Sequence, residues 1–167
     1  MKYSILFFII TFLGCSPSNR SQLKNHQIET IDQLISNWHQ DAANANLGGY
    51  MRLMDSSFMY VGTDASEKWT KDEFSTFCKP YFDQNKTWDF KSIDRTINTS
   101  ADQNSAWFYE ILQTHMGTCR GSGILELKNK QWKLRQYVLS LAIPNEKMSE
   151  VKKLIYHNDS IFQSNYK

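Results

Sequence analysis

The chain has 167 residues, which is enough for one domain with a substantial core. Its 19 basic and 17 acidic residues leave a formal net charge of +2 and form no long runs, so the sequence offers no electropositive surface for nucleic acid and excludes that class of partner. Hydrophobic residues at 41% and aromatic residues at 14% exclude a disordered chain and suit a sheet-rich fold.

The first residues have the pattern of an export signal. Lys2 precedes an apolar run from Tyr3 to Leu13 that is too short to span a bilayer comfortably, and Gly14 and Cys15 follow it. A basic start, a short apolar core and small residues at its end are typical of a signal peptide. An uncleaved membrane anchor, or an ordinary secretory signal with an incidental cysteine, is the alternative interpretation.

The end of this segment, Phe12-Leu13-Gly14-Cys15-Ser16, resembles the lipobox of bacterial lipoproteins. The resemblance implies that residues 1–14 are removed and that Cys15 carries a lipid. The protein would then be exported and anchored at a membrane of the bacterial cell envelope, on its periplasmic or surface face. Residues 15–27 are polar and contain a proline, so we expect them to form a flexible tether between the lipid and the domain.

A helical pattern begins at Ile28 and continues to Asn46, and the glycines Gly48 and Gly49 are expected to end it. One more helical turn is expected from Tyr50, followed by a short strand over residues 58–61. The apolar positions that define the first helix are Ile28, Ile31, Leu34, Ile35, Trp38, Ala42 and Ala45.

The strongest local signal in the chain is a helix start at Thr70. The side chains of Thr70 and Glu73 can form a capping box, in which each accepts a hydrogen bond from the other's backbone N–H. Trp69 can pack on Phe74 as a hydrophobic staple. Pro80 is expected to kink this helix or to end it just before the proline.

Four long strands are predicted after this helix, over residues 88–97 and within residues 105–143. Both faces of the segment 106–116 are largely apolar or aromatic, so each face is expected to be covered, one by helices and the other by a second subunit. Gly117, Gly121 and Gly123 predict a bulge, a bend or the close approach of a neighbour. Residues 146–167 are expected to form a C-terminal helix and tail.

Two cysteines, Cys78 and Cys119, remain once Cys15 is assigned to the anchor. An exported protein would permit a disulfide between them. Both lie in apolar segments, however, so two buried free thiols is the favoured interpretation. The sequence contains no CxxC motif and no cluster of Cys and His with metal-ligand spacing, so no metal and no cofactor are expected.

The order of elements and several short segments resemble the SnoaL-like branch of the nuclear transport factor 2-like (NTF2-like) superfamily over residues 28–145. The segments are Trp38 with Asp41-Ala42-Ala43, residues 58–64 (FMYVGTD), 69–74 (WTKDEF), 106–108 (AWF), 120–123 (RGSG), and 131–134 (QWKL) followed by Ser140. The resemblance implies an α+β cone in which N-terminal helices pack on the concave face of a curved antiparallel sheet and enclose a pocket. It also implies a homodimer formed through the outer sheet face, but no single activity.

Glu110 is the first candidate catalytic residue. If even-numbered residues of the sheet face the cone interior, Glu110 is a carboxylate on an apolar face and must be paired or have a raised pKa. Arg120 and Gln136 are also even-numbered, so a polar cluster of these three residues is predicted, with a structural Glu110–Arg120 ion pair as the alternative. Asp94 is a second candidate general base, unless it is a solvated strand residue.

Two histidines could complete the Asp and His pair that the resemblance implies for dehydratases of this superfamily. His39 and His115 are the candidates, since a partner for an acid would have to lie on the concave face of the sheet. Neither histidine has a motif around it.

Aromatic side chains could line a pocket for a flat apolar molecule, because small-molecule sites are mostly aromatic with few polar groups. Ordinary core packing is the alternative for most of them. The candidate ligand-binding residues are Trp38, Phe58, Tyr60, Trp69, Phe74, Phe108, Arg120, Trp132 and Gln136.

We therefore expect a lipid-anchored protein that binds a small apolar or amphipathic molecule. Two alternatives remain open. One is an acid–base enzyme of the isomerase, cyclase or hydrolyase type that uses Glu110 or Asp94, and the other is a dimeric interaction module with a filled cone.

Overall fold

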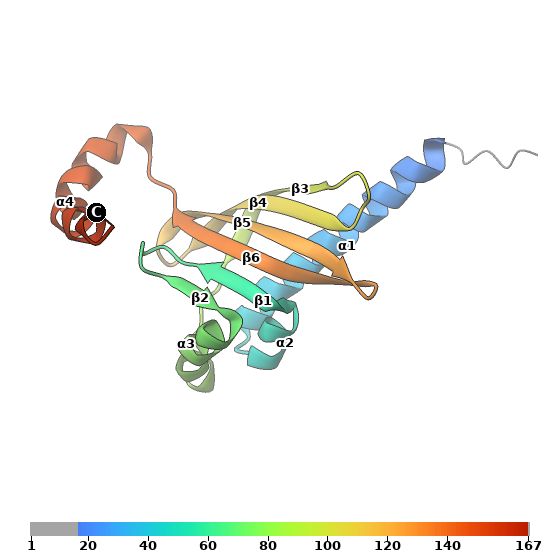
Figure 1. The fold of residues 1–167 in the computed structure, drawn as a ribbon, viewed down its shortest axis with the longest axis horizontal. Helices are drawn as coiled ribbons and strands as arrows, with labels where there is room; N and C mark the ends of the chain where they lie inside the picture. The colour runs from blue at the N-terminus through green and yellow to red at the C-terminus, as the bar shows by residue number, and fades with distance from the viewer. Residues whose placement is uncertain (1–16, 167) are drawn as a thin grey trace, which may run out of the picture.

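A six-stranded curved sheet forms the centre of the computed structural model, which describes residues 17–166 (Figure 1). The strand order is β2-β1-β6-β5-β4-β3, and all neighbours are antiparallel except β1 and β6, which are parallel. The strands are β1 (Met54–Val61), β2 (Lys68–Thr70), β3 (Lys91–Thr99), β4 (Ser105–Thr114), β5 (Gly117–Lys128) and β6 (Gln131–Leu141).

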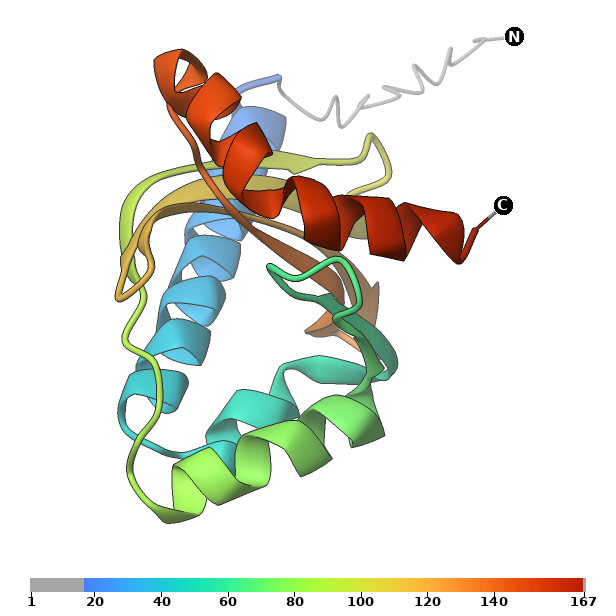
Figure 2. The same ribbon diagram turned by 90° about the vertical axis from the view of Figure 1, so that its left-hand side faces the viewer.

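Three helices cover the concave face of this sheet. Helix α1 (Pro17–Ala43) crosses the face, and α2 (Leu47–Arg52) and α3 (Lys71–Asp83) close the remaining side. Figure 2 shows α1, the sheet and α3 as three sides of a triangle. The core fills the space between them with apolar side chains, among them Ile31 and Ile35 from α1 and Phe74 from α3. The predicted α+β cone is confirmed.

The N-terminal signal peptide and Cys15 lie outside the described residues. The predicted tether of residues 15–27 is wrong from Pro17 onward, because α1 begins there rather than at Ile28. Proline is well suited to a first helical position, and no glycine or further proline interrupts the chain before Ile28. Within residues 17–166, no helix is both long enough and apolar enough to cross a membrane.

The Gly48-Gly49 pair does not end the first helix. Helix α1 stops at Ala43, and the turn is made by Ala45, whose φ is +54°. Asn46 then caps α2 by accepting a hydrogen bond from the backbone N–H of Gly49 at 3.1 Å. Both glycines lie inside α2, and a Cβ on Gly49 would lie 2.4 Å from atoms of Asn46 and Asp41. Gly49 therefore permits the close packing of α2 on the end of α1.

The capping box at the start of α3 is confirmed. The Thr70 hydroxyl accepts from the Glu73 N–H at 3.4 Å, and the Glu73 carboxylate accepts from the Thr70 N–H at 2.8 Å. The rings of Trp69 and Phe74 lie 5.8 Å apart. The expected end before Pro80 is wrong, since α3 continues to Asp83. Pro80 is exposed, and so is Thr76, the residue whose carbonyl the proline leaves without its helical partner.

The remaining elements are a 3₁₀ turn η1 (Asn145–Lys147) and helix α4 (Met148–Ser164). Helix α4 extends away from the sheet (Figure 1), and its apolar residue Leu154 is 82% exposed. The C-terminal helix is thus present as expected, and it adds nothing to the walls of the cone.

Candidate functional site

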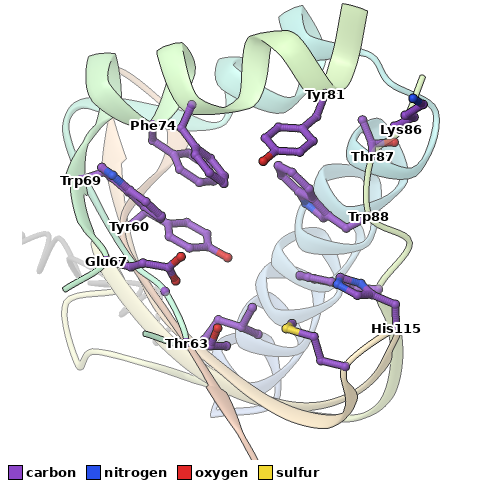
Figure 3. A pocket seen from close by; sticks show the side chains of 15 residues that line it. Tyr60, Thr63, Glu67, Trp69, Phe74, Tyr81, Lys86, Thr87, Trp88 and His115 are labelled. Carbon is purple, nitrogen blue, oxygen red and sulfur yellow. The ribbon is translucent and has the colours of Figure 1, made fainter. Parts of the chain in front are cut away.

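A cavity of about 450 Å³ lies between α3, the β1–β2 loop, the segment that leads into β3, and the β4–β5 turn. Its walls are mainly rings (Figure 3). The aromatic lining consists of Tyr60, Trp69, Phe74, Phe77, Tyr81, Trp88 and Phe90. Polar side chains reach it from Thr63, Glu67, Lys86 and His115.

The aromatic lining is one continuous belt. Tyr60 stacks on Phe74 with a centroid distance of 4.0 Å, and Trp69 stacks on Phe77 at 4.7 Å. The belt then continues from Phe77 through Tyr81, Trp88 and Phe90 to His115, each ring 5.3–6.5 Å from the next. Such contacts stabilise the rings against one another, so the walls of the cavity are preformed.

Three polar groups point into the cavity. Figure 3 shows the hydroxyls of Tyr60 and Tyr81 and the carboxylate of Glu67 directed toward its centre. Burial raises the pKa of Tyr60 well above its usual range, so this phenol remains neutral and can donate a hydrogen bond. The cavity thus combines apolar walls with a few groups able to orient a ligand.

Glu110 lies outside this cavity, in the buried core between α1 and the sheet. Its Oε1 accepts hydrogen bonds from the Tyr137 hydroxyl at 2.9 Å and from His39 Nε2 at 2.8 Å. The histidine nitrogen must carry the proton, because an ionised carboxylate can only accept. Its Oε2 accepts from Arg95 Nε at 2.9 Å. The carboxylate is fully buried, and both oxygens are occupied.

Arg95 extends this network to α1. The terminal nitrogen Nη1 of Arg95 donates to the Asp32 carboxylate at 2.8 Å and to the Ser36 hydroxyl at 2.9 Å. The arginine therefore ties α1 to β3 and β4 through one buried guanidinium.

The charges of the network set the pKa of Glu110. Burial by itself would raise that pKa, but the hydrogen bond and charge of His39 and the charge of Arg95 outweigh burial, so the pKa is lowered. Burial and the neighbouring carboxylate raise the pKa of Tyr137, which stays neutral and donates. Glu110 is consequently held as a carboxylate and cannot serve as a proton donor near neutral pH.

The glycine at position 121 is needed for this arrangement. Gly121 faces Glu110 across β4 and β5, and a Cβ there would lie 2.8 Å from Tyr137 Cζ and 3.0 Å from Glu110 Cγ. The sequence-based expectation that glycines in β5 allow the close approach of a neighbour is confirmed at this position.

The predicted Glu110–Arg120–Gln136 cluster is wrong, although the even residues of β4 do face inward. A two-residue turn joins Thr114 to Gly117, so even residues of β4 pair with odd residues of β5 and Arg120 lies exposed on the outer face. Gln136 is turned outward by a register shift between Ile124 and Leu125. Tyr137 takes the inward position that was predicted for Gln136.

The predicted inward orientation of Asp94 is also wrong. A register shift between Ser92 and Asp94 turns the strand, so that Arg95 pairs with Glu110 while Asp94 is exposed. Of the two candidate histidines, His39 lies in the core against Glu110, and His115 lies at the cavity. Arg95, Tyr137 and Trp88 were not predicted as site residues.

The nine predicted ligand-binding residues separate into groups. Tyr60, Trp69 and Phe74 line the cavity. The residues Trp38, Phe58 and Phe108 belong to the buried core, which is the alternative that the sequence left open. Trp132 lies beside a different groove, between α1 and the start of β6, and Arg120 and Gln136 are on the outer face.

Neither cysteine of the domain is paired. Cys78 and Cys119 are both buried free thiols, and burial raises the pKa of Cys78 to about 12, so it is unreactive near neutral pH. Among the residues that the structure describes, no group of His, Cys, Asp or Glu side chains could hold a metal ion.

A family model of the SnoaL-like domain matches residues 31–144. The chain belongs to the SnoaL-like family. A search of curated proteins found no match to this SnoaL-like chain. Solved structures of NTF2-like proteins share its fold.

One similar structure is an NTF2-like protein of unknown function from Pseudomonas putida KT2440, with a TM-score of 0.60, 13% identity, and coverage of 80% of this chain and 94% of that one. An NTF2-like protein from Cytophaga hutchinsonii gives a TM-score of 0.59 at 12% identity, covering 70% and 98%. The association domain of CaMKII from C. elegans gives a TM-score of 0.59 at 16% identity, covering 72% and 99%. At these identities the likeness establishes the fold alone.

Proposed function

We propose that this SnoaL-like protein binds a small apolar or amphipathic molecule in the cavity between α3 and the sheet. The observation that carries the proposal is the aromatic belt around a space of about 450 Å³, which is within the usual size of small-molecule sites. Ring stacking preforms the walls, so binding does not have to include the cost of ordering them.

Binding is favoured over acid–base catalysis by the position and chemistry of Glu110. This carboxylate does not line the cavity, and its oxygens are already engaged by His39, Arg95 and Tyr137. Its lowered pKa is the opposite of what a general acid needs. The other candidate catalytic residue, the predicted general base Asp94, is exposed on the outer face of the sheet.

A variant that blocks the entrance tests this proposal. Thr63 is exposed and lines the cavity from the β1–β2 loop, so Thr63→Trp should fill the entrance without disturbing the core. We expect ligand-observed NMR with a panel of small aromatic compounds to detect binders of the wild type whose signals return to their free values with Thr63→Trp. Ala65→Trp is the matched control, because Ala65 lies in the same loop but not in the cavity lining. Equal binding by all three proteins would contradict the proposed location.

Export and lipid anchoring at Cys15 remain part of the proposal. They are supported by the basic start, the short apolar run and the lipobox-like ending, Phe12 to Ser16. The ligand would on this basis be a molecule met at the cell envelope.

Self-association through the outer sheet face is a second proposal, supported by its exposed apolar side chains. Trp107 is 48% exposed and pairs with the exposed Ile124 on β5, and Tyr109 stands beside them. Such a contiguous apolar surface is typical of an interface. The similarity to a CaMKII association domain agrees with this interpretation.

The expected result of sedimentation analysis is a dimer for the wild type and a monomer for Trp107→Arg. Leu154→Arg on α4 is the control, because Leu154 is exposed but lies on a different element. A Trp107→Arg protein that remains dimeric would exclude the outer face of β4 as the interface.

A further inference from the structure

We propose that the molecule bound in the cavity is an organic cation, such as an alkylated ammonium group on an apolar body, with Glu67 as its counter-charge. The inference rests on the proposed function and adds the charge of the ligand. Two independent features of the same cavity carry it: the rings that line the cavity, and a carboxylate that has no cationic partner among residues 17–166.

The rings supply the first feature. An aromatic face is electron-rich, and a cation within about 6 Å of a ring centroid is attracted to it, most strongly by tryptophan. The cavity is lined by two tryptophans, Trp69 and Trp88, and by Tyr60 and Tyr81. Trp69 and Trp88 come from different segments and lie on different sides of the cavity in Figure 3, so a ligand placed between them would contact rings from more than one side.

The carboxylate of Glu67 supplies the second feature. Among the residues that the structure describes, its Oε2 accepts a hydrogen bond only from the backbone N–H of Asp64, at 3.2 Å. None of the ion pairs found among residues 17–166 includes Glu67. Glu67 is half-buried and lines the cavity beside the rings, so a cation held against those rings would lie close to this negative charge and be attracted to it.

The β1–β2 loop holds Glu67 in place. The backbone N–H of Gly62 donates to the Glu67 carbonyl at 2.9 Å, which closes the loop. The side chain of Glu67 lies directly over Gly62, where a Cβ would be 2.9 Å from Glu67 Cβ. The absence of a side chain at position 62 therefore lets the carboxylate point inward, as Figure 3 shows.

The cavity is also lined by a lysine and a histidine, and the charge of the lysine predicts which way the ligand lies. Lys86 is exposed and lies across the cavity from Glu67 in Figure 3, and His115 is also on the far side. A positive group near Lys86 would be repelled, so the cation should lie at the end formed by Glu67, Tyr60 and Trp69. The apolar part of the ligand would then point toward Trp88.

Three phenols of matched shape test the inference with the full chain. They are (4-hydroxyphenyl)trimethylammonium, neutral 4-tert-butylphenol and anionic 4-hydroxybenzenesulfonate. We expect calorimetry or NMR titration to give the ammonium compound about tenfold higher affinity than the neutral one, from its attraction to the rings and to Glu67. The sulfonate should bind most weakly. This comparison uses the wild type and does not depend on the folding of any variant.

Glu67→Gln should weaken binding of the ammonium compound about fivefold and leave the tert-butyl compound unchanged, because only one of the two ligands carries a charge. Asp64→Asn is the matched control: it removes the same charge from the same loop, but Asp64 does not line the cavity. An equal loss with both variants would overturn the assignment of Glu67.

The remaining outcomes separate this inference from the proposed function. Equal affinity for the ammonium and neutral compounds would overturn the preference for a cation and leave a binding cavity. Tightest binding of the sulfonate would assign the site to an anion, with Lys86 and His115 as its partners. If neither these phenols nor the aromatic panel bind, the proposed function fails and the inference fails with it.

Discussion

Replacing Glu110 with alanine is expected to lower the free energy of unfolding by about 3–5 kcal/mol, because removing one member of a buried ion pair leaves the other charge uncompensated. The side chain of Arg95 is 5% exposed and that of His39 is 6% exposed, so water would replace the lost carboxylate poorly. The Tyr137 hydroxyl would also lose its acceptor. Denaturant unfolding followed by fluorescence measures the loss.

Asp94→Ala is the matched control for this prediction. It removes a carboxylate from the neighbouring strand, but Asp94 is exposed and makes no side-chain hydrogen bond or ion pair among the described residues. We expect a change within about 0.5 kcal/mol, as for other surface substitutions. Equal losses for the two variants would contradict the account of the buried network.

The pH dependence of stability gives a second measure of the same network. Because the pKa of Glu110 is lowered in the folded protein, its contribution is present above the ordinary value of 4.5 and is lost as the pH falls through the folded pKa. The stability difference between the wild type and Glu110→Gln should therefore be constant near neutral pH and become smaller below about pH 4.5. A difference that grows on acidification would mean that the pKa is raised instead.

Phe74→Ala is expected to cost about 3–5 kcal/mol and to abolish ligand binding, because this ring is buried and stacks on Tyr60 at the centre of the belt. It is also the main buried contact between the start of α3 and β1. Its loss would leave a cavity beneath the helix and remove one wall of the binding site. Unfolding by denaturant and a ligand titration measure the two effects.

Phe77→Ala, one turn later on α3, is the control. Phe77 is 36% exposed and lines the same cavity, so its loss should cost less than half as much stability while still weakening binding. Equal losses of stability for the two variants would contradict a special role for the buried ring of Phe74 in the packing of α3.

The elements that depend on local chemistry could be predicted from the sequence. The helix start at Thr70 is determined by neighbouring residues, since the capping box and the staple each span only a few positions. The alternation in β4 also placed Glu110 correctly on the inner face, because one strand has a fixed period of two.

The partners of Glu110 could not be predicted, because they depend on how strands are aligned. A shift of one residue moves a side chain to the opposite face of a sheet. The turn of His115 and Met116 moves Arg120 outward, and the irregularities at Ser92/Asp94 and Ile124/Leu125 bring Arg95 and Tyr137 inward. A two-residue turn could have been recognised in the sequence, but the two irregularities left no local signal.

The cavity was predicted only in part for a similar reason. Tyr60, Trp69 and Phe74 lie close to the recognisable helix start, whereas Trp88 and His115 reach the cavity from a connecting segment and a distant turn. Their aromatic character was visible in the sequence. Their meeting point depends on the curvature of the whole sheet.

Native mass spectrometry of the chain purified from its own host, without added ligand, tests the central claim most directly. A bound small molecule is expected on the wild type and on Ala65→Trp, but not on Thr63→Trp, whose larger side chain should occupy the cavity that Thr63 lines. The mass of that molecule would identify its chemical class. A ligand-free mass for all three proteins, or a bound molecule that remains on Thr63→Trp, would contradict a binding function for this cavity.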